Sequence, residues 1–227
     1  MTTDRLTPIA QYLILAKLNH CFKDTHLSVL ELADFIGVEQ ASIRRAAQNL
    51  EWLGFARRVH GQGADLHKVY LEWKMGKVQL WEKAIRWMRK PVVRHYHVST
   101  PENMDAFIPG GANLLSERTT GFKIDGKPHL VYKGFSQKRE SNEALIHRVK
   151  PTEADYVVEF WSHPPLLPGK TEMDNLSLYL SIDPTGDRNI ELNHCLILTT
   201  FDWDGKGVYR PRIFRRTKTA TDVLFRR

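Results

Sequence analysis

Six polar side chains between residues 40 and 49 bring guanidinium, amide and hydroxyl groups together in one short segment. An arginine can donate two hydrogen bonds to O6 and N7 of guanine, and a glutamine or asparagine can pair with N6 and N7 of adenine. This chemistry suits the major groove of double-stranded DNA. We expect the first four residues to contact bases and the last two to contact bases or the DNA backbone. In chain order they are Gln40, Ser42, Arg44, Arg45, Gln48 and Asn49.

A second group of side chains, between residues 57 and 68, is suited to phosphates or to the adjacent minor groove. It consists of Arg57, Arg58, His60 and Lys68. The chain carries a net charge of +7, which agrees with a polyanionic partner. Basic residues outnumber acidic ones within residues 1–90 and again in the tail, residues 210–227.

An amphipathic helix over residues 39–53 would position the first group. Its apolar residues recur at helical spacing and should face the core, which leaves the opposite face for polar side chains. Arg45 would project almost opposite Ile43, and Gly54 would end the helix. The apolar residues are Ile43, Ala46, Ala47, Leu50 and Leu53.

Two further helices should precede this one. Thr7 can cap a helix over residues 8–22, with Pro8 in its first turn. Ser28 and Glu31 have the spacing of a capping box at the start of a short helix over residues 29–36. Gly37 is suited to the left-handed position that ends such a helix.

Two β-prone runs, residues 55–60 and 67–73, flank a turn at residues 61–63 and predict a hairpin. The order helix, short helix, helix, hairpin predicts a winged helix-turn-helix in residues 1–75. A helix over residues 77–90 within the segment 76–90 would connect it to a second domain, residues 91–227. That domain should be α+β, so the fold class is α+β with an N-terminal winged helix-turn-helix and a mixed C-terminal domain.

The second domain shows strand patterns at residues 92–98, 128–132 and 155–161 and a final strand near 213–216. Short helices are expected at residues 101–107, 112–115, 142–148, 175–182 and 190–199. No apolar run is long enough to span a bilayer, and the N-terminus lacks the pattern of a secretory signal. We therefore expect a cytoplasmic protein without a membrane partner. The two cysteines, Cys21 and Cys195, favour neither a disulfide framework nor a zinc site.

The segment from Val157 to Trp161, the Pro165 break and the capped run from Asp174 to Ser181 resemble the C-terminal domain of AbiEi-like antitoxins. The layout of a winged helix followed by an α+β domain is similar to the same family. This resemblance implies an autorepressing regulator from a toxin–antitoxin or phage-defence operon. It also implies a nucleotidyltransferase-like toxin as the functional partner.

Two alternatives use other residues. His95 and His97 alternate on one expected strand face, which resembles the metal-binding strand of HUH nucleases, with Tyr179 as the candidate nucleophile. Alternating polar positions on a half-exposed strand explain the two histidines without a metal. A winged helix can also serve as a protein-interaction adaptor. We expect a DNA-binding transcription regulator rather than an enzyme, with no cofactor and no metal site; the sequence leaves the oligomeric state open.

Overall fold

The computed structural model describes residues 5–22, 27–121, 124–134, 146–185 and 187–203. The chain forms two compact units. Unit 1 comprises Met1–Arg89 with Leu167–Lys170, and unit 2 comprises Lys90–Leu166 with Thr171–Arg227. The described residues contain both helices and sheets, so the predicted α+β class is confirmed. No helix in the described part of the chain is long and apolar enough to cross a membrane.

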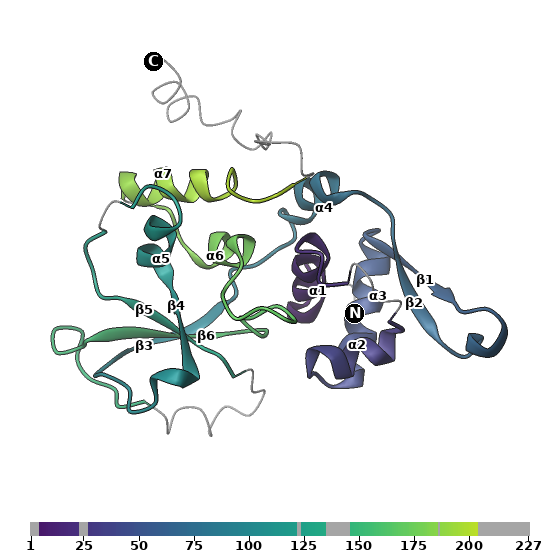
Figure 1. The fold of residues 1–227 in the computed structure, drawn as a ribbon, viewed down its shortest axis with the longest axis horizontal. Coiled ribbons are helices and arrows are strands. Elements are labelled where there is room, and N and C mark those ends of the chain that lie inside the picture. Colours follow the sequence, from purple (N-terminus) through teal and green to yellow (C-terminus); the bar gives the residue numbers. More distant parts are fainter. Residues whose placement is uncertain (1–4, 23–26, 122–123, 135–145, 186, 204–227) are drawn as a thin grey trace, which may run out of the picture. The chain divides into compact units, whose positions relative to one another are not determined.

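Unit 1 begins with helix α1 (Pro8–Leu18), which is capped as predicted (Figure 1). The Thr7 hydroxyl accepts a hydrogen bond from the backbone N–H of Ala10, at 3.3 Å. The helix ends before the predicted residue 22. The Asn19 side chain donates to the carbonyl of Leu15 at 2.9 Å, and His20 adopts a positive φ of 58°, which interrupts helical geometry.

Helix α2 (Val29–Ile36) has the bounds that the sequence predicts. The Ser28 hydroxyl accepts from the N–H of Glu31, and the Glu31 carboxylate accepts from the N–H of Ser28 at 2.7 Å. Gly37 ends the helix in the left-handed conformation, with φ 76°. The predicted capping box and terminating glycine are therefore confirmed.

Helix α3 (Gln40–Trp52) buries the face that periodicity predicts. Its buried apolar side chains are Ile43, Ala46, Ala47 and Leu50. Gly54, with φ 72°, follows the helix and lets the chain turn into the next strand.

A hairpin follows, made of strands β1 (Ala56–His60) and β2 (Val69–Trp73). The strands are antiparallel, with Ala56 opposite Trp73 and His60 opposite Val69. Their connection is longer than the predicted turn at residues 61–63, because it includes a 3₁₀ turn, η1 (Gly63–Asp65). A Cβ atom at Gly61 would lie 2.4 Å from the Asp65 carbonyl oxygen, so this close approach requires glycine.

Helix α4 (Lys77–Ala84) belongs to unit 1 and is shorter than the predicted helix over residues 77–90. Leu80, Trp81 and Ala84 are buried. Beyond the helix, the Gln11 side chain donates to the Arg89 carbonyl at 2.9 Å and accepts from the Arg89 N–H at 2.8 Å. The backbone N–H and carbonyl of Arg89 thus bond to the Gln11 side chain rather than along a helix, and these bonds join the segment to α1.

Unit 2 contains a four-stranded sheet in the order β3-β6-β5-β4. Its strands are β3 (Val92–Val98), β4 (Phe107–Gly110), β5 (His129–Tyr132) and β6 (Tyr156–Trp161). The β5/β6 pair is parallel, and the other two pairs are antiparallel. Helices α5 (Gly111–Glu117), α6 (Asn175–Ser181) and α7 (Arg188–Ile197) lie on one side of this sheet (Figure 1).

Within the described residues, two of the helices expected in unit 2 are not formed, and one expected strand lies outside these residues. The expected helix over residues 101–107 is only a 3₁₀ turn, η2 (Met104–Ala106), and Phe107 begins β4 instead. In the expected helix over residues 142–148, only the last three residues are described; they are not helical, and Arg148 forms a β-bridge with Val98. The expected strand at 213–216 and the basic tail lie outside the described residues.

The two faces of the sheet differ in composition. One face carries a core of Val98, Phe107, Leu130 and Val158, with tyrosine and phenylalanine rings packed against it. The other carries Val131, Val157 and Glu159, all buried.

Candidate nucleic-acid interface

The exposed face of α3 is a continuous strip of polar side chains with one large ring at its end. Gln40, Arg44, Arg45 and Gln48 are exposed, as the sequence predicts. Trp52 extends the strip by one further turn and is 69% exposed. The buried face of the helix fixes this strip toward solvent, because the helix cannot rotate without exposing Ile43 and Leu50.

The two arginines of this strip carry uncompensated charge. Among the described residues, neither guanidinium has a carboxylate within ion-pair distance. The Arg45 Nε donates to the Ala41 carbonyl at 3.3 Å, and its Nη2 contacts the Ser42 hydroxyl at 3.5 Å. A guanidinium without a carboxylate partner keeps its donors and its charge available for an anionic ligand.

Ser42 and Asn49, which the sequence also assigned to DNA contact, do not belong to the exposed strip. Both are buried, on the flank that packs against the rest of unit 1. The Asn49 side chain accepts from the N–H of Thr7 at 2.9 Å and donates to the Arg5 carbonyl at 3.3 Å. Its amide thus joins α3 to the start of α1. Because a polar side chain can be buried by such bonds, residue type alone does not predict exposure.

Replacing Asn49 with alanine should therefore reduce stability rather than ligand affinity. Loss of the amide leaves the partly buried N–H of Thr7 without its acceptor, which costs about 1 kcal/mol or more of unfolding free energy. Urea denaturation of Asn49→Ala would measure this loss. An unchanged unfolding free energy combined with weakened binding to DNA would show that Asn49 acts on the ligand instead.

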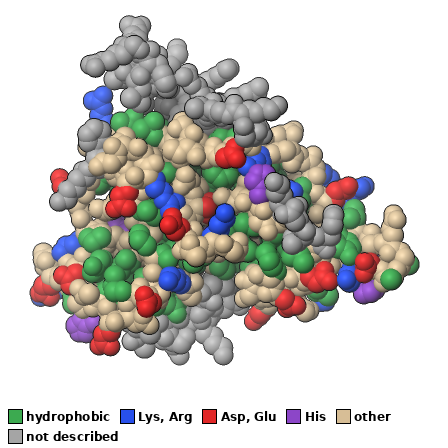
Figure 2. Space-filling view, viewed as in Figure 1, with side chains coloured by type: hydrophobic (Ala, Val, Ile, Leu, Met, Phe, Trp, Pro, Cys, Tyr) green, Lys and Arg blue, Asp and Glu red, His purple; other side chains and the backbone are tan. Residues whose placement is uncertain are grey.

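The hairpin residues of the second group are held by carboxylates of the same unit, except for the exposed His60. Arg57 Nη2 lies 2.6 Å from Glu72 Oε2, and Arg58 Nε lies 2.7 Å from Glu51 Oε2. Figure 2 shows acidic and basic side chains interleaved over the hairpin, at the right of the view. The hairpin therefore presents paired charges rather than a bare basic surface.

Lys68 is held in the same way, by two carboxylates. Its Nζ lies 3.0 Å from Glu31 Oε1 and 3.2 Å from Asp65 Oδ1. Hydrogen bonds from Ser28 and then from Lys68 lower the pKa of Glu31 to about 2, and the bond to Glu31 raises the pKa of Lys68. Glu31 thus serves both the α2 cap and the hairpin.

The carboxylate partners were missed in the sequence, although one signal was present. Arg57 and Glu72 are cross-strand partners in the hairpin register, which counting outward from the turn would have approximated. The Arg58 partner, Glu51, lies near the end of α3, and the Arg58 N–H also donates to it at 3.1 Å. These bonds lower the pKa of Glu51, with the backbone hydrogen bond as the largest cause.

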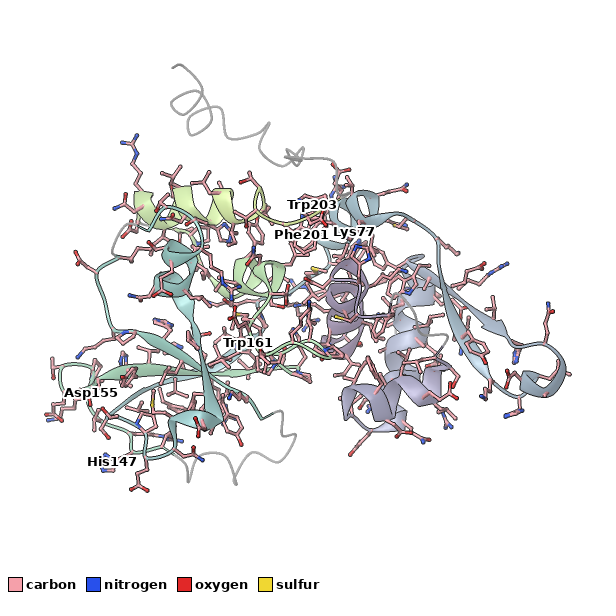
Figure 3. The ribbon with its side chains drawn as sticks, viewed as in Figure 1. Lys77, His147, Asp155, Trp161, Phe201 and Trp203 are labelled. Atoms are coloured by element: carbon pink, nitrogen blue, oxygen red, sulfur yellow. The ribbon has the colours of Figure 1, made fainter. Side chains whose placement is uncertain are left out.

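Unit 2 places the histidines of the nuclease alternative beside a buried carboxylate. The rings of His95 and His97 lie 6.4 Å apart on β3, and His95 is opposite Glu159 of β6. Glu159 accepts from Nε1 of Trp161 at 3.2 Å and lies 2.7 Å from Nδ1 of His129. Trp161 stands at one end of β6, and Asp155 precedes the other end (Figure 3).

Three observations bear on the nuclease alternative. Within the described ranges, no group of three or more His, Cys, Asp or Glu residues is arranged to hold a metal ion. The ring of Tyr179, the candidate nucleophile, stacks on His194 with 3.9 Å between the ring centroids. Burial raises the pKa of Tyr179 to about 12, which opposes formation of the phenolate. The hydrogen bonds around Glu159 therefore explain how a buried carboxylate is satisfied, and they do not form the metal site that a nuclease would need.

The strongest site on chemical grounds is the exposed strip of α3. It combines rigid placement, two amide side chains and two arginines for which the described ranges contain no carboxylate partner. Comparisons of the chain with protein-family models, with curated proteins and with solved structures found no match.

Proposed function

We propose that residues 1–75 are a winged helix-turn-helix and that the chain is a transcription regulator that binds specific sequences of double-stranded DNA. In this proposal α3 is the recognition helix, α2 is the helix that precedes it, and the β1–β2 hairpin is the wing. The order and lengths of these elements support the assignment.

One observation carries the proposal: the exposed face of α3 presents Arg44, Arg45, Gln40 and Gln48, and the arginines have no carboxylate partner in the described part of the chain. An α-helix fits the major groove, where arginine and glutamine side chains discriminate base pairs. A merely solvated helix face would commonly pair such arginines with acids at the next turn. Here the positive charge is left for an external anion.

The direct test uses the full chain and a pool of random duplexes. Selection by repeated binding should yield a preferred sequence, and fluorescence anisotropy should then give an affinity at least about 1,000-fold tighter than for a scrambled duplex. Binding should weaken as salt rises and should not require a divalent cation. Failure to enrich any sequence at physiological salt would favour the adaptor role. Nicking of DNA that requires Mg²⁺ or Mn²⁺ would favour the nuclease.

The resemblance to AbiEi-like antitoxins extends this proposal to autorepression and antitoxicity. An autorepressor should bind the DNA immediately upstream of its own reading frame. An antitoxin should restore growth to cells that express a nucleotidyltransferase-like toxin from the same operon. Restored growth by a chain lacking unit 1 would assign the antitoxin activity to unit 2, and unrestored growth by the full chain would contradict that activity.

A further inference from the structure

We propose that Glu51 and Glu72 are specificity determinants, because they neutralise Arg57 and Arg58 of the hairpin and make DNA binding depend more on the exposed strip of α3. This inference rests on the proposed function. In this inference the two acidic residues weaken those contacts with DNA that do not depend on the base sequence.

The geometry shows how fully the two arginines are engaged. Arg57 contacts Glu72 Oε2 through both Nε, at 2.9 Å, and Nη2, at 2.6 Å. Arg58 contacts Glu51 through its backbone N–H, at 3.1 Å, and through Nε, at 2.7 Å. Each carboxylate therefore accepts two hydrogen bonds from its arginine partner.

The two pairs also occupy different parts of unit 1. Arg57 and Glu72 face each other across the β1–β2 ladder, so hairpin geometry keeps them together. The Arg58–Glu51 pair joins the hairpin to the last turn of α3. The fold therefore places an acidic residue beside each of the two arginines at the start of the hairpin.

Neutral pairs change how the protein binds DNA. Each phosphate that a cation neutralises releases counterions, and it contributes about −0.9 to the slope of log affinity against log salt. An arginine beside a carboxylate adds no net charge, so Arg57 and Arg58 should contribute little to this slope. Arg44 and Arg45 of α3, which have no carboxylate partner among the described residues, should together contribute roughly −2 to this slope.

This arrangement favours specificity over affinity. Non-specific binding is almost entirely electrostatic, whereas specific binding also uses base contacts. Acids that neutralise the hairpin therefore weaken non-specific binding more, in proportion, than specific binding. Glu51 and Glu72 should raise the ratio of the two affinities.

The test is the Glu51→Gln, Glu72→Gln double variant of the full chain. Glutamine preserves size and an acceptor oxygen but removes the charge, so Arg57 and Arg58 become net cations. We expect affinity for a scrambled duplex to rise about tenfold or more at low salt and the salt slope to steepen by roughly 2. The preference for the selected duplex over the scrambled one should fall.

Asp34→Asn supplies the matched control for a single change of charge, because Asp34 is exposed on α2 and has no ion-pair partner among the described residues. Its slope should stay close to that of the wild type. Thermal melting checks the fold of the double variant, which should be retained because exposed ion pairs contribute little to stability. An unchanged slope and an unchanged specificity ratio in the folded double variant would overturn this inference alone. Failure of the wild-type chain to bind any duplex would overturn the proposed function and this inference together.

Discussion

Replacing both Arg44 and Arg45 with alanine is expected to weaken binding to the selected duplex by at least about 30-fold. A base-reading arginine contributes roughly 1–3 kcal/mol, so two such residues should contribute 2 kcal/mol or more. Both side chains are exposed on α3, so their removal leaves the core of unit 1 intact. Fluorescence anisotropy would measure the loss, and the preference among bases should relax at the positions that these residues read.

The matched control removes the same charge elsewhere in unit 1. Arg86 and Arg89 are exposed after α4 and have no carboxylate partner in the residues that the structure describes. Their double replacement by alanine should change affinity only a few-fold, because it removes charge outside the exposed strip of α3 and removes no proposed base contact. Equal losses in the two double variants would mean that net charge, rather than the α3 face, determines binding.

Local signals in the sequence were sufficient to predict which helices unit 1 contains, although α1 and α4 end earlier than predicted. The α1 cap at Thr7 and the Ser28–Glu31 capping box depend on residues only three positions apart, and both are present. The periodicity of α3 predicted its buried face, because one apolar stripe must face the core. Such features need no knowledge of distant parts of the chain.

The errors arose where a residue's environment depends on distant segments. Asn49 was expected on the exposed face of α3, yet it is buried and bonds Thr7 and Arg5, more than 40 positions away in the chain. Strand β4 was missed because it is short and includes Pro109 and Gly110, residues that strands usually avoid. Glu159 gains its buried environment from strands that are adjacent only after folding.

The candidate site was therefore predictable in part. Spacing indicated which residues of α3 could face outward, and Gln40, Arg44, Arg45 and Gln48 do so. The charge that the surface presents was predictable only in part, because Glu72 follows from the hairpin register, whereas the tertiary fold brings Glu51 to Arg58. Because of these acids, Arg57 and Arg58 of the hairpin carry paired charges where the sequence suggested a bare basic surface.

The stability of unit 2 is expected to fall by about 2–3 kcal/mol between pH 7 and pH 4.5 because of His163. This side chain is fully buried, and burial lowers its pKa to about 4, although its hydrogen bond to the Pro164 carbonyl acts in the opposite direction. In the unfolded chain the pKa returns to about 6.5, so the unfolded state binds the proton first. Stability is therefore complete above about pH 6.5, declines as pH falls toward 4 and levels off below that value. Burial also lowers the pKa of His194, which adds to the loss in the same direction.

Hydrogen exchange of the β6 backbone amides, compared at each pH between wild type and His163→Gln, would isolate the contribution of His163. Comparison at equal pH cancels the intrinsic pH dependence of exchange. The lowered carboxyl pKa values of Glu31 and Asp183 cannot produce the effect, because such groups destabilise the fold only below their unfolded values, near 4.5 and 3.8. The glutamine variant should lose most of the decline between pH 6.5 and 4.5 while keeping the decline at lower pH. The same decline in both proteins would show that His163 is protonated in the folded state without cost, which its burial opposes.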